Sequence, residues 1–199
     1  MIHPQTPKHK IPICIGIYGP RLAGKDTAAH HIENILDLTK ISLADPIKDE
    51  YSKLLGLSLA CLYKQGSTKE KHRIGLITLG MLRREEDINW WCKLLHSRVH
   101  YDKGIVIPDI RFKNEVEYFV KHSEIFILLK INASLETRKK HGWSRSIADS
   151  TATEIDHLQF EPNTSYTIHN NKGIINLHND LDTMIDKLCL GNVIDCVIN

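Results

Sequence analysis

Residues 19–27 read GPRLAGKDT, a spacing of glycines and lysine that could bind phosphate. Gly19 and Gly24 permit a tight turn, and Lys25 adds a positive charge directly after the second glycine. The backbone N–H groups of such a loop, and the N-terminus of a helix after it, face phosphate oxygens. We expect the phosphates of a nucleotide to be bound here, by Gly19, Arg21, Ala23, Gly24, Lys25, Asp26 and Thr27.

Asp26 stands where the phosphate-binding pattern has Ser or Thr, with Thr27 one position late. The match is therefore either accidental or a loop with an altered metal ligand, and Asp26 could also simply cap the following helix. The flanking residues favour a functional loop. Residues 11–18 are apolar and β-branched like a buried parallel strand, and residues 26–36 have the pattern of a helix.

A second acidic residue, Asp109, ends the apolar run 104–109. Nucleotide-binding proteins with this type of loop place the carboxylate that holds Mg²⁺ at such a strand end. The alternative is a turn aspartate after Pro108. If the strand continues, Arg111 lies on the same side as Asp109, where it could contact a phosphate or pair with that carboxylate.

Two groups of cations could bind a second, anionic substrate. Lys48 falls in the first turn of a helix for which Asp45 is the expected N-cap, and it serves either an anionic acceptor or only the solvated surface. Lys69 and Arg73 are four residues apart on a helix and could grip one phosphate, or could belong to a solvated face.

Residues 134–145, SLETRKKHGWSR, concentrate positive charge around Gly142, a candidate hinge. Cations on a mobile flap can exclude water and neutralise charge on a transferring phosphoryl group. An exposed basic loop without function would look the same. The cations of this segment are Arg138, Lys139, Lys140, His141 and Arg145.

The whole chain has the composition of one soluble α/β domain: 199 residues, 42% hydrophobic and 25% charged. A net charge of +2 is too small to favour a nucleic acid polymer or a membrane surface. The five cysteines contain no C-x-x-C pair, which indicates free thiols in a reducing compartment. Residues 1–10 are polar and proline-containing, so we expect a disordered lead-in and a cytoplasmic protein.

Strand and helix patterns alternate along the chain, which predicts a parallel, doubly wound sheet. Polar segments follow three of the strands and should meet at one edge of the sheet, as in a site for two phosphorylated substrates. Trp90 and Trp91 are expected to pack rather than to stack on a base. The expected strands are 11–18, 38–44, 104–109, 124–131 and 165–170, and the expected helices are 26–36, 45–56, 69–80, 84–99 and 179–190.

Together, GKDT, ADPIK, the LG-x-x-x-R-x-x-D-x-x-x-W stretch from Leu79 to Trp91, PDIRFKNE and HNNKG resemble the deoxynucleoside monophosphate kinases of bacteriophages and their cellular relatives, over residues 13–188. The resemblance implies an α/β, three-layer P-loop NTPase fold of the nucleoside monophosphate kinase type, with a central parallel sheet of about five strands. It implies ATP and Mg²⁺ as cofactors, and Asp26 as a family feature that binds the metal with Asp109. It also assigns Arg84 to acceptor binding and Asn170 to nucleotide binding.

The chain also resembles animal-type phosphomevalonate kinases, through KE-x-x-R at Lys69, Glu70 and Arg73, through Cys92 and through RKKHGW. GKDT and PDIRFKNE favour the nucleotide kinases instead. Our main prediction is a kinase domain over residues 11–190, with a lid at 133–155, that transfers the γ-phosphoryl group of ATP to a (deoxy)nucleoside monophosphate. The alternatives are a phosphomevalonate kinase and a non-catalytic nucleotide-binding module.

In the kinase prediction, Lys25, Arg138 and Arg145 are catalytic, and the acceptor is bound by Lys48, Lys69, Arg73, Arg84 and Arg111. The expected partner is a small phosphorylated molecule, bound by a monomer or a homodimer. Neither a nucleic acid polymer nor a membrane is expected as a partner.

Overall fold

The computed structural model describes residues 3–63, 67–145 and 165–190. The chain divides into two compact units. Ser42–Arg98 and the N-terminal residues up to Lys8 form a helical unit, and His9–Ile41 with the residues from Val99 onward form a sheet unit. The described cysteines, Cys14, Cys61, Cys92 and Cys189, are free thiols as expected, and Cys196 lies outside the described residues.

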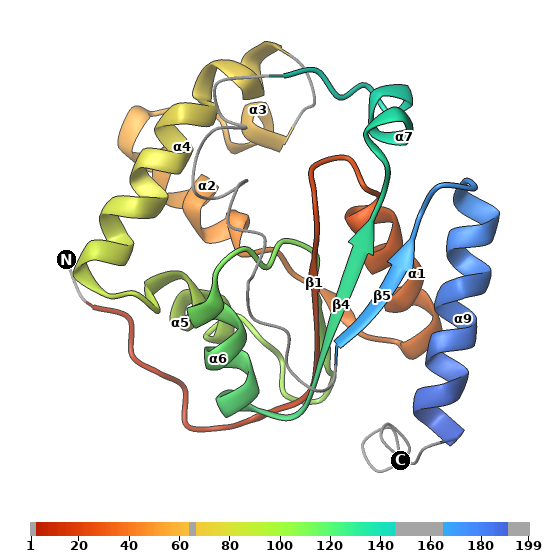
Figure 1. Cartoon of the computed structure of the whole chain (residues 1–199). Helices are drawn as coiled ribbons and strands as arrows, with labels where there is room; N and C mark the ends of the chain where they lie inside the picture. The colour runs from red at the N-terminus through yellow and green to blue at the C-terminus, as the bar shows by residue number, and fades with distance from the viewer. Residues whose placement is uncertain (1–2, 64–66, 146–164, 191–199) are drawn as a thin grey trace. The chain divides into compact units, whose positions relative to one another are not determined.

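Within the described residues, the sheet unit contains five parallel strands in the order β2-β3-β1-β4-β5. Figure 1 shows β1, β4 and β5 side by side in that order. Gly16 in the central strand lies opposite Ile107 on one side and Leu128 on the other. The predicted α/β class with a five-stranded parallel sheet is therefore confirmed. The strands are β1 (Ile11–Tyr18), β2 (Thr39–Lys40), β3 (Ile105–Ile107), β4 (Ser123–Asn132) and β5 (Ser165–His169).

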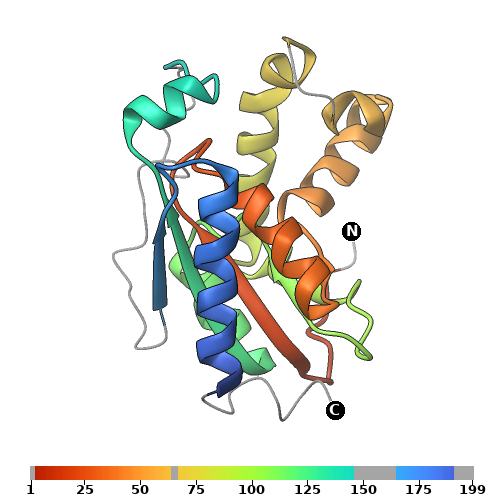
Figure 2. The ribbon, with the colours of Figure 1, turned by 90° about the vertical axis from the view of Figure 1, so that its right-hand side faces the viewer.

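Helices α1 (Lys25–Leu36) and α9 (Ile174–Leu190) cover one face of this sheet (Figure 2). Alternate side chains of β1 point toward them, because successive residues of a strand face opposite sides. α6 (Lys113–His122) packs on β1 and β4 with side chains outside that core cluster. The cluster includes Ile13, Ile15, Ile17, Ala28, Ile32, Ile127, Leu129, Leu177 and Leu181.

The helical unit consists of α2 (Ala44–Leu55), α3 (Leu59–Tyr63), α4 (Ser67–Glu86) and α5 (Trp90–His96). Trp90 and Trp91 are buried as expected, and the Trp91 indole N–H donates to the Gly80 carbonyl over 2.9 Å. That bond ties α5 to α4. Among the described helices of both units, none combines the length and apolar character needed to span a membrane.

Four expectations about element boundaries are wrong. The helix expected at 179–190 begins five residues earlier, at Ile174. The strand expected at 38–44 is confined to Thr39–Lys40, because it is an edge strand that pairs only with the short β3. The helices expected at 69–80 and 84–99 are instead one 20-residue helix followed by a shorter one. The break lies at Asp87, whose carboxylate accepts the Asn89 N–H over 2.9 Å and replaces a helical bond.

Asp45 is also not an N-cap, because α2 already begins at Ala44. Its carboxylate accepts the backbone N–H of Ser42 over 3.3 Å from within the first turn. The remaining strand predictions agree with β1, β3, β4 and β5 to within a few residues. Residues 3–10 form neither helix nor strand, and the ring of His3 lies edge-on to that of Trp90.

Candidate active site

The GPRLAGKDT loop joins β1 to α1 and requires both of its glycines. Gly19 has a φ of 136°, and a Cβ there would lie 2.0 Å from the carbonyl oxygen of Ile131. Gly24 has a φ of 102° and is the N-cap of α1. A Cβ at Gly24 would lie 2.5 Å from Asn170 Nδ2, so a side chain at either position would clash and strain the loop.

Lys25, the first residue of α1, turns its ammonium group onto the loop itself. Its Nζ donates to the carbonyl of Gly19 over 2.8 Å and to that of Pro20 over 2.9 Å. The positive charge therefore lies at the mouth of the loop, close to the N-terminal end of α1. This is where the loop would present its backbone N–H groups to a phosphate.

Asp26 is the second residue of α1, with 86% of its side chain exposed. Because the N-cap is Gly24, the helix-capping explanation for Asp26 does not apply. Its Oδ1 lies 3.7 Å from Lys40 Nζ, in an exposed ion pair. Its negative charge near the N-terminus of α1 interacts favourably with the helix dipole. The carboxylate is exposed to solvent and is therefore accessible to a metal ion beside the loop.

Asp109 lies in a turn rather than in a strand. β3 ends at Ile107 because Pro108 has no N–H to donate. The strand therefore does not continue, and the alternation that would put Arg111 on the same side as Asp109 does not apply. The Ile110 N–H donates to the Ile17 carbonyl over 3.1 Å. This bond places the turn of Asp109 beside the end of β1, where the phosphate-binding loop begins.

Glu115 organises the segment after this turn and was missed by the sequence analysis. Its buried carboxylate accepts the N–H of Arg111 over 2.7 Å and that of Phe112 over 3.0 Å. These bonds fix the chain at the start of α6 and thereby the backbone of Arg111. The spacing of the segment FKNE, with Glu three residues after the N-cap, is the signal that could have revealed it.

Asn170 follows β5 and holds the phosphate-binding loop. Its side chain is nearly buried, with 6% exposed, and Nδ2 donates to the Ala23 carbonyl over 2.9 Å. Its backbone N–H donates to Asn132 at the end of β4 over 2.8 Å. These two bonds link the ends of β4 and β5 to the loop. The Asn170 side chain thereby holds the backbone of the loop at Ala23.

The neighbouring Asn171 supports the helix α7 (Leu135–Lys140). Its Oδ1 accepts the Ser134 N–H over 2.8 Å and the Thr137 hydroxyl over 3.2 Å. Two consecutive asparagines therefore bind two different parts of the site, the loop and the first turn of α7. The sequence motif HNNKG drew attention to the segment but not to this division of roles.

Residues that follow α7 contact the phosphate-binding loop. Arg21 Nη2 donates to the Ser144 carbonyl over 2.6 Å, and His141 Nδ1 lies 3.0 Å from the Leu22 carbonyl oxygen. Gly142 has a φ of 87° and ends the helix, as a left-handed glycine commonly does. The basic segment is thus docked on the loop, and the predicted lid residues 146–155 lie outside the described residues.

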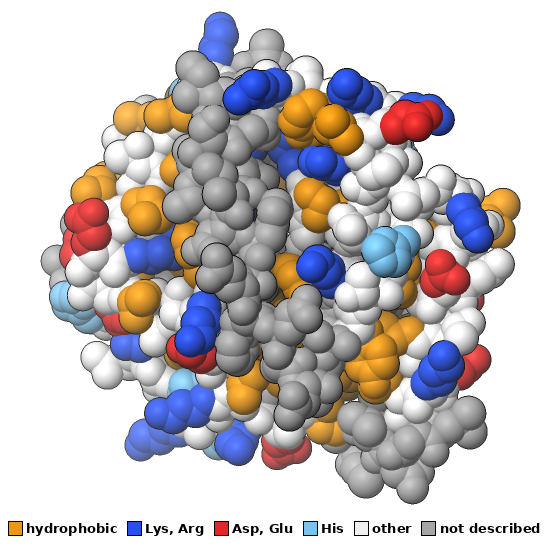
Figure 3. Space-filling model, viewed as in Figure 1, with side chains coloured by type: hydrophobic (Ala, Val, Ile, Leu, Met, Phe, Trp, Pro, Cys, Tyr) orange, Lys and Arg blue, Asp and Glu red, His pale blue; other side chains and the backbone are white. Residues whose placement is uncertain are grey.

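Arg138 and Arg145 differ in their surroundings. The Arg138 guanidinium lies 5.5 Å from the centre of the Trp143 ring, which orients it on α7. Arg145 is exposed after the helix. In the space-filling view, Lys and Arg side chains and an acidic one gather at the top right, over α7 (Figure 3). Within α7, Glu136 pairs with Lys140 over 2.9 Å.

In the helical unit, Lys48 is neither solvent-exposed nor unpaired, so the expectation of plain solvent exposure is wrong. Only 12% of its side chain is exposed. Its Nζ lies 3.1 Å from Asp45 Oδ1 and 4.0 Å from the centre of the Tyr63 ring. The structure therefore fixes this ammonium group through two neighbours that the spacing of ADPIK did not reveal.

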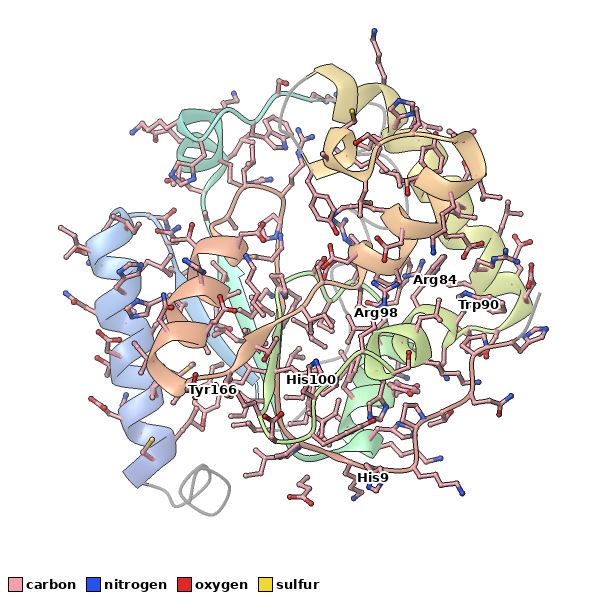
Figure 4. All side chains as sticks on the ribbon, turned by 180° about the vertical axis from the view of Figure 1, so that it is seen from behind. His9, Arg84, Trp90, Arg98, His100 and Tyr166 are labelled. Atoms are coloured by element: carbon pink, nitrogen blue, oxygen red, sulfur yellow. The ribbon has the colours of Figure 1, made fainter. Side chains whose placement is uncertain are left out.

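The other predicted acceptor residues of this unit belong to α4. Arg73 and Arg84 are 11 residues apart, about three turns, and share one face of the helix. Arg84 Nη1 donates to the Gly80 carbonyl over 3.0 Å. Arg84 and Trp90 are labelled in Figure 4, which views the molecule from the side opposite to Figure 1. The side chain of Lys69 lies outside the described residues.

Arg83, next to Arg84, has a structural role that the sequence did not distinguish. Its side chain is buried, with 8% exposed, and donates to Glu50 over 2.8 Å and to Glu86 over 2.8 Å. Donation to Glu50 raises the pKa of the guanidinium above its ordinary value. Arg83 thereby joins α4 to α2, and its charge is used within the fold.

Comparisons with known proteins point to one family. A family model described as phosphomevalonate kinase matches residues 17–125, from the end of β1 through α6 to the start of β4. A Drosophila melanogaster protein named phosphomevalonate kinase is 28% identical over 148 residues, covering 70% of this chain and 78% of the fly protein. A gluconokinase from Sinorhizobium meliloti superposes with a TM-score of 0.51 at 10% identity, over 92% of this chain and 99% of that one, and shows the fold alone.

Proposed function

Since the chain belongs to the phosphomevalonate kinase family and is a kinase with an ATP-binding P-loop, we propose that it transfers the γ-phosphoryl group of ATP to the phosphate of phosphomevalonate. The observation that carries this proposal is the family match over residues 17–125, which includes the phosphate-binding loop and all of α4. The family model and the fly relative favour this acceptor over the nucleoside monophosphate that we expected first.

The loop of the sheet unit is proposed to bind the donor nucleotide. Lys25 would exchange its two loop carbonyls for the β- and γ-phosphoryl oxygens, since a phosphate binds an ammonium more strongly than a neutral carbonyl does. Asp26 and Asp109 would hold Mg²⁺, which usually takes one or two carboxylates together with substrate phosphates. When bound, the ion would neutralise negative charge on the β- and γ-phosphoryl oxygens.

Cations of the helical unit are proposed to bind the acceptor. Phosphomevalonate carries a phosphate monoester and a carboxylate, so its recognition calls for more than one positive group. Lys48, Lys69, Arg73 and Arg84 are proposed to supply these groups, and Arg111 of the sheet unit to contact a phosphate. The acceptor's own phosphate oxygen is the nucleophile, so the protein's task is to position it and to neutralise charge.

The segment after β4 is proposed to complete the reaction centre. Arg138 and Arg145 would neutralise the charge that spreads over the transferring phosphoryl group. The bond from Arg21 of the loop to the Ser144 carbonyl, and the contact of His141 with the Leu22 carbonyl, would hold this segment close to the donor phosphates. Water would be excluded as the segment closes over the bound substrates.

A non-catalytic nucleotide-binding module is the competing function. It is disfavoured by the complete set of Lys25, Asp109, Arg138 and Arg145, which a module without transfer has no need to retain. ADP release measured with phosphomevalonate, mevalonate and deoxynucleoside monophosphates separates the two cases, with Lys25→Ala as the blank. The proposal is supported if phosphomevalonate is the only one of these acceptors that is turned over. Equal turnover with unphosphorylated mevalonate would refute it.

A further inference from the structure

The side chain of Lys48 belongs to a closed cluster of three residues in the helical unit. Asp45 Oδ1 lies 3.1 Å from Lys48 Nζ and accepts the Tyr63 hydroxyl over 2.9 Å. The Tyr63 ring completes the cluster, because the same ammonium lies 4.0 Å from its centre. Each member thus contacts the other two, and α3 is joined to α2 through this contact.

Tyr63 contributes to the cluster through two separate parts of its side chain. The face of the ring attracts the ammonium through its quadrupole. The hydroxyl donates to Asp45 and keeps the carboxylate on the same side of the ammonium. Burial and the bond to Asp45 raise the pKa of the phenol, so it remains a protonated donor over the whole neutral range.

From this geometry, we propose that Tyr63 and Asp45 are positioning residues that hold Lys48 for binding the acceptor's phosphate. The inference rests on the proposed function, which gives Lys48 to the acceptor. A free lysine side chain loses much rotamer entropy when it binds a phosphate, whereas a lysine already fixed by its neighbours loses less. The cluster therefore increases acceptor affinity without contacting the acceptor's reacting atoms.

The exposures of the side chains separate this role from a purely structural one. Tyr63 is 47% exposed, so its removal costs little buried surface, whereas Lys48 is 12% exposed and depends on its neighbours for its position. Loss of Tyr63 should therefore change acceptor binding more than stability. Asp45 is bound additionally by the Ser42 N–H, which keeps the carboxylate in place when Tyr63 is changed.

Steady-state kinetics on the full chain tests the inference with Tyr63→Phe, Tyr63→Leu and Lys48→Ala. Tyr63→Phe keeps the ring and should raise the KM for phosphomevalonate about threefold, whereas Tyr63→Leu should raise it about tenfold. Both should leave kcat and the KM for ATP within about twofold of wild type. Lys48→Ala should raise the acceptor KM about a hundredfold. Tyr101→Phe, in the sheet unit, is the matched control and should change nothing.

The outcomes distinguish the inference from the function on which it rests. An unchanged acceptor KM in Tyr63→Leu, together with a raised one in Lys48→Ala, would overturn the inference and leave the function intact. An unchanged KM in Lys48→Ala would overturn both the inference and the assignment of Lys48. If wild type used only another phosphorylated acceptor, phosphomevalonate transfer would be wrong, and the same variants measured with that acceptor would decide the inference. If Tyr63→Leu has a lower Tm than wild type, the acceptor KM of Tyr63→Phe decides instead: a threefold rise supports the inference, and an unchanged value overturns it.

Discussion

Replacing Asn170 by alanine should loosen the phosphate-binding loop and destabilise the protein. Asn170 Nδ2 donates a hydrogen bond to the carbonyl of the buried Ala23, and the alanine variant lacks this donor. Loss of a hydrogen bond to a buried acceptor costs about 1–3 kcal/mol. For a chain of this size, that loss lowers the Tm by about 2–12 °C.

Asn170→Asp should be worse than Asn170→Ala at neutral pH, since it places a negatively charged acceptor where a donor now faces the Ala23 carbonyl. Asn171→Ala is the matched control. Asn171 is exposed and binds the first turn of α7 instead of the loop, so its loss should cost less than about 1 kcal/mol. The three Tm values should therefore fall in the order Asn171→Ala, Asn170→Ala, Asn170→Asp.

Thermal unfolding and the KM for ATP, measured on the same preparations, test this reasoning. A loop that is no longer held at Ala23 should bind ATP about tenfold more weakly, because its N–H groups are no longer preorganised. If Asn170→Ala lost ATP affinity but melted within about 1 °C of wild type, the reasoning would be refuted. Asn170 would then contact the nucleotide directly rather than hold the loop.

Four further substitutions have distinct expected outcomes. Lys25→Ala should lower kcat about a hundred- to a thousandfold, with a Tm within about 2 °C of wild type; retained activity would remove Lys25 from the donor site. Asp26→Asn should raise the Mg²⁺ concentration for half-maximal rate about tenfold at unchanged Tm, and an unshifted titration would remove Asp26 from the metal site. Arg83→Ala should lower the free energy of unfolding in urea by about 3–5 kcal/mol, because Glu50 loses its partner. Arg84→Ala should cost about 1 kcal/mol, and equal losses would contradict the separation of these two arginines.

The sequence was most informative where local pattern and local structure coincide. The run IPICIGIY is typical of a buried parallel strand, and the glycines and lysine that follow it indicate a turn into a helix. Loop, strand and helix were therefore predictable together, since each depends on residues close in sequence. The alternation of strands and helices then fixed the parallel sheet, because parallel neighbours need a crossover.

The sequence was least informative where a side chain takes its role from a distant partner. Nothing in RREED distinguishes Arg83, which is buried against Glu50, from Arg84 beside it. Likewise, the spacing of ADPIK leaves Lys48 either to an anionic acceptor or to the solvated surface, and it does not reveal the contacts of Lys48 with Tyr63 and Asp45. Such roles depend on tertiary packing, which residue spacing does not determine.

The acceptor was harder to predict than the fold for a related reason. A P-loop kinase binds ATP through a loop whose glycines and lysine are visible in sequence. The acceptor is bound by a few cations such as Arg73 and Arg84, and these would suit a nucleotide phosphate as well as phosphomevalonate. GKDT and PDIRFKNE therefore led to the nucleotide kinases, and the family match over residues 17–125 favours the other acceptor.

An internal competition experiment tests the central claim most directly. Purified protein receives ATP, Mg²⁺ and equal concentrations of phosphomevalonate and deoxythymidine monophosphate, and ³¹P NMR follows both acceptors in one tube. We predict that the phosphomevalonate monoester signal is replaced by a pair of diphosphate signals as ADP forms, while the nucleotide signal stays constant. Conversion of the nucleotide to its diphosphate ahead of phosphomevalonate would contradict the account.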